Sequence, residues 1–216
     1  MLDHRLLGGR CPSPLFAADE PSGPSGPQSP APAAPPALPQ EPVTTEHKIE
    51  LGGKKLRYFV TVGTLPIKNA DGDVEANLFY TAYSLGSKDG DRKRPLTFTF
   101  NGGPGSSSVW LHLGGLAPKR VRMLDDGAMP APPFKLIDNE FTWLEKTDLV
   151  FIDPVDTGYS RATSPENAVK LKGVEGDLNA VGEFIRLYLS RAKRWTSPLF
   201  LAGESYGTFR AAGLSG

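Results

Sequence analysis

Residues 199–207 read Leu-Phe-Leu-Ala-Gly-Glu-Ser-Tyr-Gly, and they decide how the rest of the chain is interpreted. An apolar run, Leu199–Ala202, leads directly into the pattern Gly-x-Ser-x-Gly. This pattern is typical of a nucleophile elbow, a sharp turn from a strand into a helix that exposes a serine hydroxyl above a sheet. The glycines are required because a Cβ at either position would collide with neighbouring backbone. We therefore predict that Ser205 is a nucleophile, although the pentapeptide alone would also fit a glycine-rich surface loop.

Composition and charge exclude several classes of function. The chain has 216 residues with 24 basic and 24 acidic side chains, so it offers no electrostatic footprint for nucleic acid or an anionic membrane. No apolar run approaches the roughly 18 residues of a membrane-spanning helix. The single cysteine, Cys11, excludes an internal disulfide, and His4, His47 and His112 show no ligand spacing. We expect neither a metal site nor a cofactor.

The first 46 residues differ in composition from the rest. Eleven of the 21 prolines fall between Pro12 and Pro42, mixed with serine, alanine and glycine. Such a segment buries too little apolar surface to fold, so we expect residues 1–46 to be a disordered linker and residues 47–216 to form the folded part. A ligand for proline-binding modules is the alternative. The first residues give no convincing signal peptide, which leaves either a cytoplasmic protein or a start downstream of a lost signal.

Hydrophobic patterns beyond residue 47 predict an α/β fold. Residues 55–62 and 77–84 are rich in aromatic and β-branched side chains, and a turn at 69–73 separates them, so we predict an antiparallel pair at a sheet edge. Two continuous apolar runs, at 95–100 and 148–153, are typical of buried parallel strands.

A helix is predicted between the second buried strand and the elbow, at about residues 174–195. Leu178, Val181, Ile185 and Leu189 form one apolar stripe. Strand, helix and strand in this order indicate a right-handed parallel unit, with the elbow strand next in the sheet.

The loop after the first buried strand reads Asn101-Gly-Gly-Pro-Gly105. Acyl-transfer chemistry needs a second backbone donor for the oxyanion, and adjacent glycines let an amide approach the reacting carbonyl closely. A plain Gly-Pro turn is the alternative for this loop.

Three blocks in this order resemble the serine carboxypeptidases: Asn101-Gly-Gly-Pro-Gly-Ser-Ser-Ser108, Asp153-Pro-Val-Asp-Thr-Gly-Tyr-Ser160 and Gly203-Glu-Ser-Tyr-Gly207. The resemblance covers roughly residues 95–216. It implies an α/β-hydrolase fold and an enzyme that removes C-terminal amino acids from peptides with a free carboxylate. It also suggests a secreted or periplasmic setting.

The resemblance also implies a role for each matching residue. Ser205 would be the nucleophile, and the backbone amides of Gly103 and Tyr206 would form the oxyanion hole. Asn101 and Glu204 would bind the terminal carboxylate of the substrate. A glutamate can donate to a carboxylate only when it is protonated, so we expect burial and like charge to raise the pKa of Glu204 and acidic conditions to be favoured. The alternative is that Glu204 is a solvated elbow residue.

Three departures separate this sequence from the family pattern. Ser106 stands where the family usually has a disulfide-bonded cysteine, and Gly115 stands where a further acidic residue commonly helps to hold the substrate carboxylate. No Asp, Glu or His follows Gly207, although the acid and base of this fold come after the serine. We interpret His112 as a structural or surface residue.

The third departure leads us to interpret the chain as the N-terminal part of such an enzyme, truncated before its acid and base and inactive alone. We expect its open sheet edge to favour aggregation. A same-scaffold acyltransferase or esterase and a non-catalytic peptide-binding fragment remain the alternatives.

Overall fold

The computed structural model describes residues 41–216, so Cys11, His4 and most of the predicted linker lie outside the described residues. Strand β1 spans Val43–Leu51 and therefore begins four residues before the predicted boundary at residue 47. The prolines just upstream concealed this start. Val43 pairs with Val62 and Thr44 with Thr61, so β-branched residues extend the sheet to this point.

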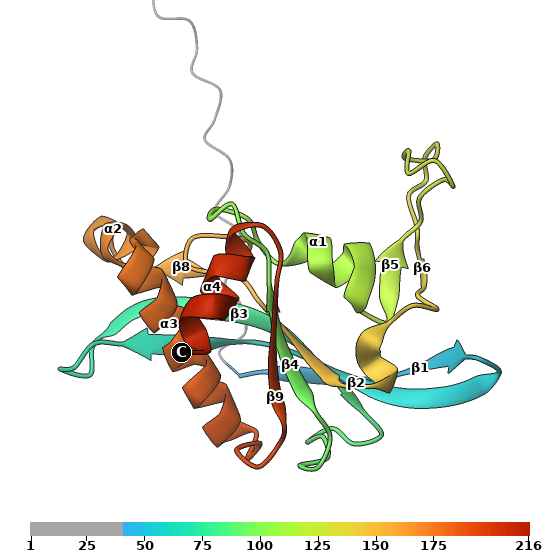
Figure 1. The fold of residues 1–216 in the computed structure, drawn as a ribbon, viewed down its shortest axis with the longest axis horizontal. Coiled ribbons are helices and arrows are strands. Elements are labelled where there is room, and N and C mark those ends of the chain that lie inside the picture. Colours follow the sequence, from blue (N-terminus) through green and yellow to red (C-terminus); the bar gives the residue numbers. More distant parts are fainter. Residues whose placement is uncertain (1–40) are drawn as a thin grey trace, which may run out of the picture. The chain divides into compact units, whose positions relative to one another are not determined.

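One mixed sheet organises the described residues (Figure 1). Its strand order is β1-β2-β3-β7-β4-β9. The bounds of the remaining strands in this path are Lys54–Lys68 (β2), Val74–Leu85 (β3), Asp148–Ile152 (β7), Leu96–Phe100 (β4) and Leu199–Gly203 (β9). The short strand β8, Arg161–Ala162, pairs with β3 outside this path.

The strand pairings confirm the predicted antiparallel pair and correct two details. β2 and β3 are antiparallel, but β1 lies outside them and forms the edge of the sheet. β4 is parallel to both β7 and β9. The elbow strand β9 therefore lies beside β4 and not beside β7, which places the ends of β4 and β9 next to each other.

Alternation along the buried strands produces a core on each face of the sheet. On β7, Val150 and Ile152 contact one cluster, whereas Leu149 and Phe151 contact the other. The first cluster includes Phe184 of helix α3, which spans Val174–Arg191. Successive side chains of a strand point to opposite faces, so these continuous apolar runs are covered on both sides.

Helices α3 and α4 lie on the first of these faces, as Figure 1 shows. Helix α4 spans Tyr206–Leu214, and α2 spans Pro165–Lys172. The predicted stripe of α3 is largely confirmed, because Val181 and Leu189 are buried and Ile185 packs against the same core.

The opposite face carries the short helix α1 (Val109–Leu111) and the π-helical turn η1 (His112–Leu116). The hairpin of β5 (Lys119–Val121) and β6 (Leu136–Asp138) and the 3₁₀ turn η2 (Trp143–Glu145) follow in the chain. Among residues 41–216, no helix is both long and apolar enough to cross a membrane.

Candidate active site

Ser205 lies at the turn between β9 and α4, with φ 55° and ψ −125°. This backbone conformation is strained for any residue with a side chain. A Cβ on Gly203 would lie 1.9 Å from the carbonyl oxygen of Gly207, and a Cβ on Gly207 would lie 2.5 Å from that of Phe100. Both glycines of the motif are therefore required, and the turn has the geometry of a nucleophile elbow.

The glycine-rich loop after β4 meets this elbow because β4 and β9 are adjacent and parallel. A Cβ on Gly102 would lie 2.3 Å from the backbone nitrogen of Tyr206, so only glycine permits the approach. Gly103 has φ +104°. Neither the Gly103 amide nor the Tyr206 amide donates a hydrogen bond to another residue within 41–216. Two free N–H donors thus lie close to the Ser205 turn.

Asn101 and Glu204 are brought together beside the elbow. The Asn101 Nδ2 donates to Glu204 Oε2 at 3.0 Å, and Asn101 Oδ1 accepts from the Leu111 amide at 3.0 Å. Asn101 is fully buried, which fixes its orientation. Glu204 is exposed in the structure of residues 41–216, so the prediction that its side chain is buried is wrong for this part of the protein. A residue at the outer side of the turn is shielded only by elements that cover the elbow, and no described segment does so.

Arg210 of α4 supports this arrangement, and the sequence analysis missed it. Its Nη1 donates to the carbonyl oxygen of Asn101 at 2.7 Å, and its Nε donates to Asp177 Oδ2 at 2.7 Å. The guanidinium lies 5.6 Å from the Phe100 ring and 5.2 Å from the Tyr206 ring. Arg210 thereby links the glycine-rich loop, the elbow helix and α3. The acidic first turn of α3, which contains Asp177, was the available signal in the sequence.

The block at 153–160 holds the other end of the glycine-rich loop. The Ser108 amide donates to Asp153 Oδ1 at 2.9 Å, and a Cβ on Gly158 would lie 1.9 Å from Asp153 Oδ2. Burial raises the pKa of Asp153, and the hydrogen bonds from Ser108 and Tyr159 oppose this rise. This block therefore acts as a support for the loop.

Neither described histidine makes a hydrogen bond to Ser205. The His112 Nε2 lies 2.6 Å from the Tyr83 hydroxyl oxygen, and its ring stacks on Phe151 at 4.5 Å between centroids. Burial lowers the pKa of His112 to about 4. His47 stacks on Tyr58 in the β1–β2 region. The structural interpretation of His112 is confirmed, and residues 41–216 bring no imidazole to the nucleophile.

The described residues contain no group of three or more His, Cys, Asp or Glu side chains that could hold a metal ion. The donors and acceptors gathered at the elbow are thus backbone amides, one serine hydroxyl, one amide side chain and one carboxyl group. This set is suited to nucleophilic chemistry at a carbonyl carbon.

Comparison with known proteins agrees with this geometry. The family model described as "Serine carboxypeptidase" matches residues 63–211. The pheromone-processing carboxypeptidase KEX1 of Saccharomyces cerevisiae (strain JAY291) is 32% identical over 155 residues, which are 67% of this chain and 20% of the yeast protein. The serine carboxypeptidase-like 11 protein of Arabidopsis thaliana is 28% identical over 135 residues, 61% of this chain and 29% of the plant protein.

A solved structure shows the same fold. The crystal structure of Kex1(delta)p, a prohormone-processing carboxypeptidase from Saccharomyces cerevisiae, superposes with a TM-score of 0.57 at 28% identity. The match covers 73% of this chain and 33% of the yeast chain. The chain thus spans between a fifth and a third of the length of these relatives, and its incomplete sheet is part of an α/β-hydrolase fold. It belongs to the serine carboxypeptidase family.

Proposed function

We propose that this chain supplies the nucleophile, the oxyanion hole and the carboxylate-binding groups of a serine carboxypeptidase. The juxtaposition of the Ser205 turn with two free amides, those of Gly103 and Tyr206, carries the proposal. Preorganised N–H donors that point to a developing oxyanion are a large source of rate enhancement in acyl transfer.

In the proposed reaction, the Ser205 hydroxyl oxygen bonds to the carbonyl carbon of the last peptide bond of the substrate. The serine proton passes to a general base and then to the departing amino group, so that the C-terminal amino acid leaves. The carbonyl oxygen carries negative charge in the intermediate and accepts hydrogen bonds from the Gly103 and Tyr206 amides. Water then hydrolyses the acyl-enzyme and regenerates Ser205.

The general base comes from outside residues 41–216 in this proposal. His112 is bound to Tyr83 in the core, and His47 lies against Tyr58, so neither is positioned to take the serine proton. A serine hydroxyl without a neighbouring base is a weak nucleophile. We therefore expect the 216-residue chain alone to hydrolyse peptides very slowly.

Asn101 and Glu204 are proposed to bind the free carboxylate of the substrate. The Asn101 amide already donates to Glu204 Oε2, so both side chains are held at one place. Glu204 could donate to a carboxylate only when protonated, whereas the ionised form would repel it.

Two other functions compete with this proposal. An acyltransferase or esterase on the same scaffold is favoured by Gly115, which stands where the family commonly has an acidic carboxylate-binding residue. A non-catalytic peptide-binding role is favoured by the lack of a histidine at Ser205 within the described residues.

Hydrolysis of one peptide in two forms distinguishes these functions. The longest form of the protein that the gene encodes is incubated with a peptide that has either a free or an amidated C-terminus, with Ser205→Ala as the control. A carboxypeptidase should release the last residue from the free form about 100-fold faster, because the amide removes the recognised charge, and Ser205→Ala should abolish release. Equal rates on ester and amidated substrates would favour the esterase, and binding without Ser205-dependent turnover would favour the peptide-binding role.

A further inference from the structure

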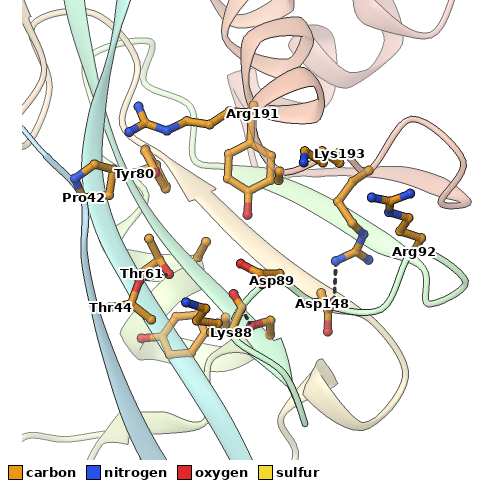
Figure 2. A pocket seen from close by; sticks show the side chains of 17 residues that line it. Pro42, Thr44, Thr61, Tyr80, Lys88, Asp89, Arg92, Asp148, Arg191 and Lys193 are labelled. Atoms are coloured by element: carbon orange, nitrogen blue, oxygen red, sulfur yellow. Dashed lines mark hydrogen bonds and ion pairs between the residues drawn. The ribbon is translucent and has the colours of Figure 1, made fainter.

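A cavity lies away from the elbow, at the opposite ends of the parallel strands, where β4 and β7 begin (Figure 2). Its volume is about 510 Å³. It is lined by residues of β1–β3, of the loop at residues 86–95 and of the end of α3 with the turn that follows it. This size lies within the range of small-molecule sites.

The cavity carries an excess of positive charge. Its lining includes five cationic side chains and two carboxylates, whereas the whole chain is balanced at 24 of each sign. The five cations line the cavity from two elements: Lys88 and Arg92 from the loop, and Arg191, Lys193 and Arg194 from the end of α3 and the turn after it. Figure 2 labels Lys88, Arg92, Arg191 and Lys193.

One of the two carboxylates is already neutralised by the protein. Asp148 accepts from Arg194 Nη1 at 2.7 Å, from Arg94 Nε at 3.1 Å and from the Leu85 amide at 3.1 Å. The other, Asp89, is exposed. Among residues 41–216, Lys88, Arg92 and Lys193 form no ion pair with a carboxylate. These three cations can therefore serve an external anion.

Two phenolic hydroxyls add neutral donors to the cavity wall. Tyr80 and Tyr188 pack edge to face with ring centroids 5.5 Å apart, and both line the cavity. Tyr80 is buried and Tyr188 is half-buried, and neither hydroxyl has a hydrogen-bond partner among the described residues. Burial raises the pKa of both hydroxyls, so both remain protonated donors at neutral pH. A hydroxyl that lines a cavity and has no partner within residues 41–216 can donate to a bound ligand.

We propose that this cavity binds a small phosphate-bearing anion, independently of the Ser205 site. A phosphoryl group offers several acceptor oxygens, which can accept from ammonium, guanidinium and phenol donors at the same time. The exposed cations Lys88, Arg92 and Lys193 would pair with the negative charge of the anion. The Tyr80 and Tyr188 hydroxyls would donate hydrogen bonds to the phosphate oxygens that lie deepest in the cavity.

Calorimetric titration of the 216-residue chain with pyrophosphate, inorganic phosphate and citrate tests the proposal. Pyrophosphate should bind with a 1:1 stoichiometry, and citrate, a carboxylate of similar charge, should bind at least about 10-fold more weakly because its planar groups match the donors less well. The triple variant Lys88→Gln, Arg92→Gln, Lys193→Gln should weaken pyrophosphate binding at least about 10-fold. Tyr80→Phe, which keeps the ring, should weaken it about threefold.

The matched control is Lys54→Gln, Lys55→Gln, Lys135→Gln, which removes the same charge from exposed positions outside the cavity. It should leave pyrophosphate affinity within about twofold of the parent chain. Equal weakening by the two triple variants would mean that only net charge matters and would overturn the proposal. No binding at millimolar pyrophosphate would overturn it as well, and citrate binding as tight as pyrophosphate binding would overturn the assignment to phosphate.

Discussion

Two buried arginine–aspartate pairs lie at opposite ends of the sheet, and they differ in how completely they are satisfied. At the end where β4 and β7 begin, all three nitrogens of the Arg194 guanidinium group donate: Nε to Ser197 Oγ, Nη1 to Asp148 and Nη2 to the carbonyl oxygen of Arg94. At the elbow end, Arg210 uses Nε and Nη1, but its buried Nη2 has no partner among the described residues.

The difference separates a fully paired structural network from the incompletely satisfied arginine beside the elbow. The Asp148 network ties β3, β4, β7 and the end of α3 together, and every charged group in it is paired. The elbow end combines a strained serine with a guanidinium nitrogen and two backbone amides that have no partner within residues 41–216. Unsatisfied donors and strain cost stability, and proteins retain them mainly at functional sites.

The largest expected effect comes from breaking the complete network with Asp148→Asn. The substitution leaves Arg94 and Arg194 facing a neutral amide, so two desolvated cations lose their counter-charge. We expect the free energy of unfolding to fall by about 3–5 kcal/mol, measured by urea denaturation at neutral pH. A loss below 1 kcal/mol would show that the network does not hold this end of the sheet together.

The next effect concerns the stability of the fold in acid, and it involves His112. This histidine follows Leu111, whose backbone amide donates to Asn101 Oδ1 beside the elbow. Burial lowers the pKa of His112 from 6.5 to about 4, so the unfolded chain binds the proton more readily than the folded chain. Stability should therefore fall as the pH drops from about 6.5 to about 4, by on the order of 3 kcal/mol.

The measurement is urea denaturation across this pH range with His112→Phe, and His47→Phe as the control at an exposed histidine. His112→Phe should flatten the pH dependence and His47→Phe should leave it nearly intact. An identical slope in the parent chain and His112→Phe would assign the acid sensitivity to other groups.

A smaller loss is expected from Asp177→Asn at the incomplete pair. Arg210 would still donate to the Asn101 carbonyl and face the rings of Phe100 and Tyr206. We expect a loss of about 1–3 kcal/mol in the free energy of unfolding. A loss equal to that of Asp148→Asn would remove the distinction between the two ends.

The smallest effect is a gain in stability. Ser205→Gly should stabilise the chain by about 1 kcal/mol, because glycine adopts φ 55°, ψ −125° without strain. Ser205→Ala keeps the strain and serves as the matched control, and Lys193→Gly tests the positive-φ residue at the other end. A higher melting temperature for Ser205→Gly than for Ser205→Ala and Lys193→Gly would locate the strain at the elbow. No gain over Ser205→Ala would argue against stored strain there.

The sequence predicted the parts of the molecule that depend on local patterns. Continuous apolar runs located β4, β7 and β9, and Gly-x-Ser-x-Gly located the elbow, because the requirement for glycine beside a strained serine is itself local. The first residues of β1 were missed because they directly follow a proline-rich segment. They form a strand because they pair with β2, and such pairing is not visible in the local sequence.

The contacts that hold the site could not be predicted in the same way. Arg210 and Asp177 are 33 positions apart, and Asp148 and Arg194 are 46 apart, so nothing in their local sequence connects them. The burial of Glu204 was also predicted wrongly, since exposure at the elbow depends on which segments cover it. The roles of Ser205, Gly103, Tyr206, Asn101 and Glu204 remain predictions.

Fluorophosphonate labelling of the 216-residue chain, read by intact mass, tests the central claim most directly. The claim is that these residues build a nucleophile elbow and oxyanion hole but bring no histidine to Ser205. With folding established by circular dichroism, we expect no label beyond that of the Ser205→Ala control. Stoichiometric labelling that disappears in Ser205→Ala would contradict the claim, because Ser205 would then be activated by a base within this chain.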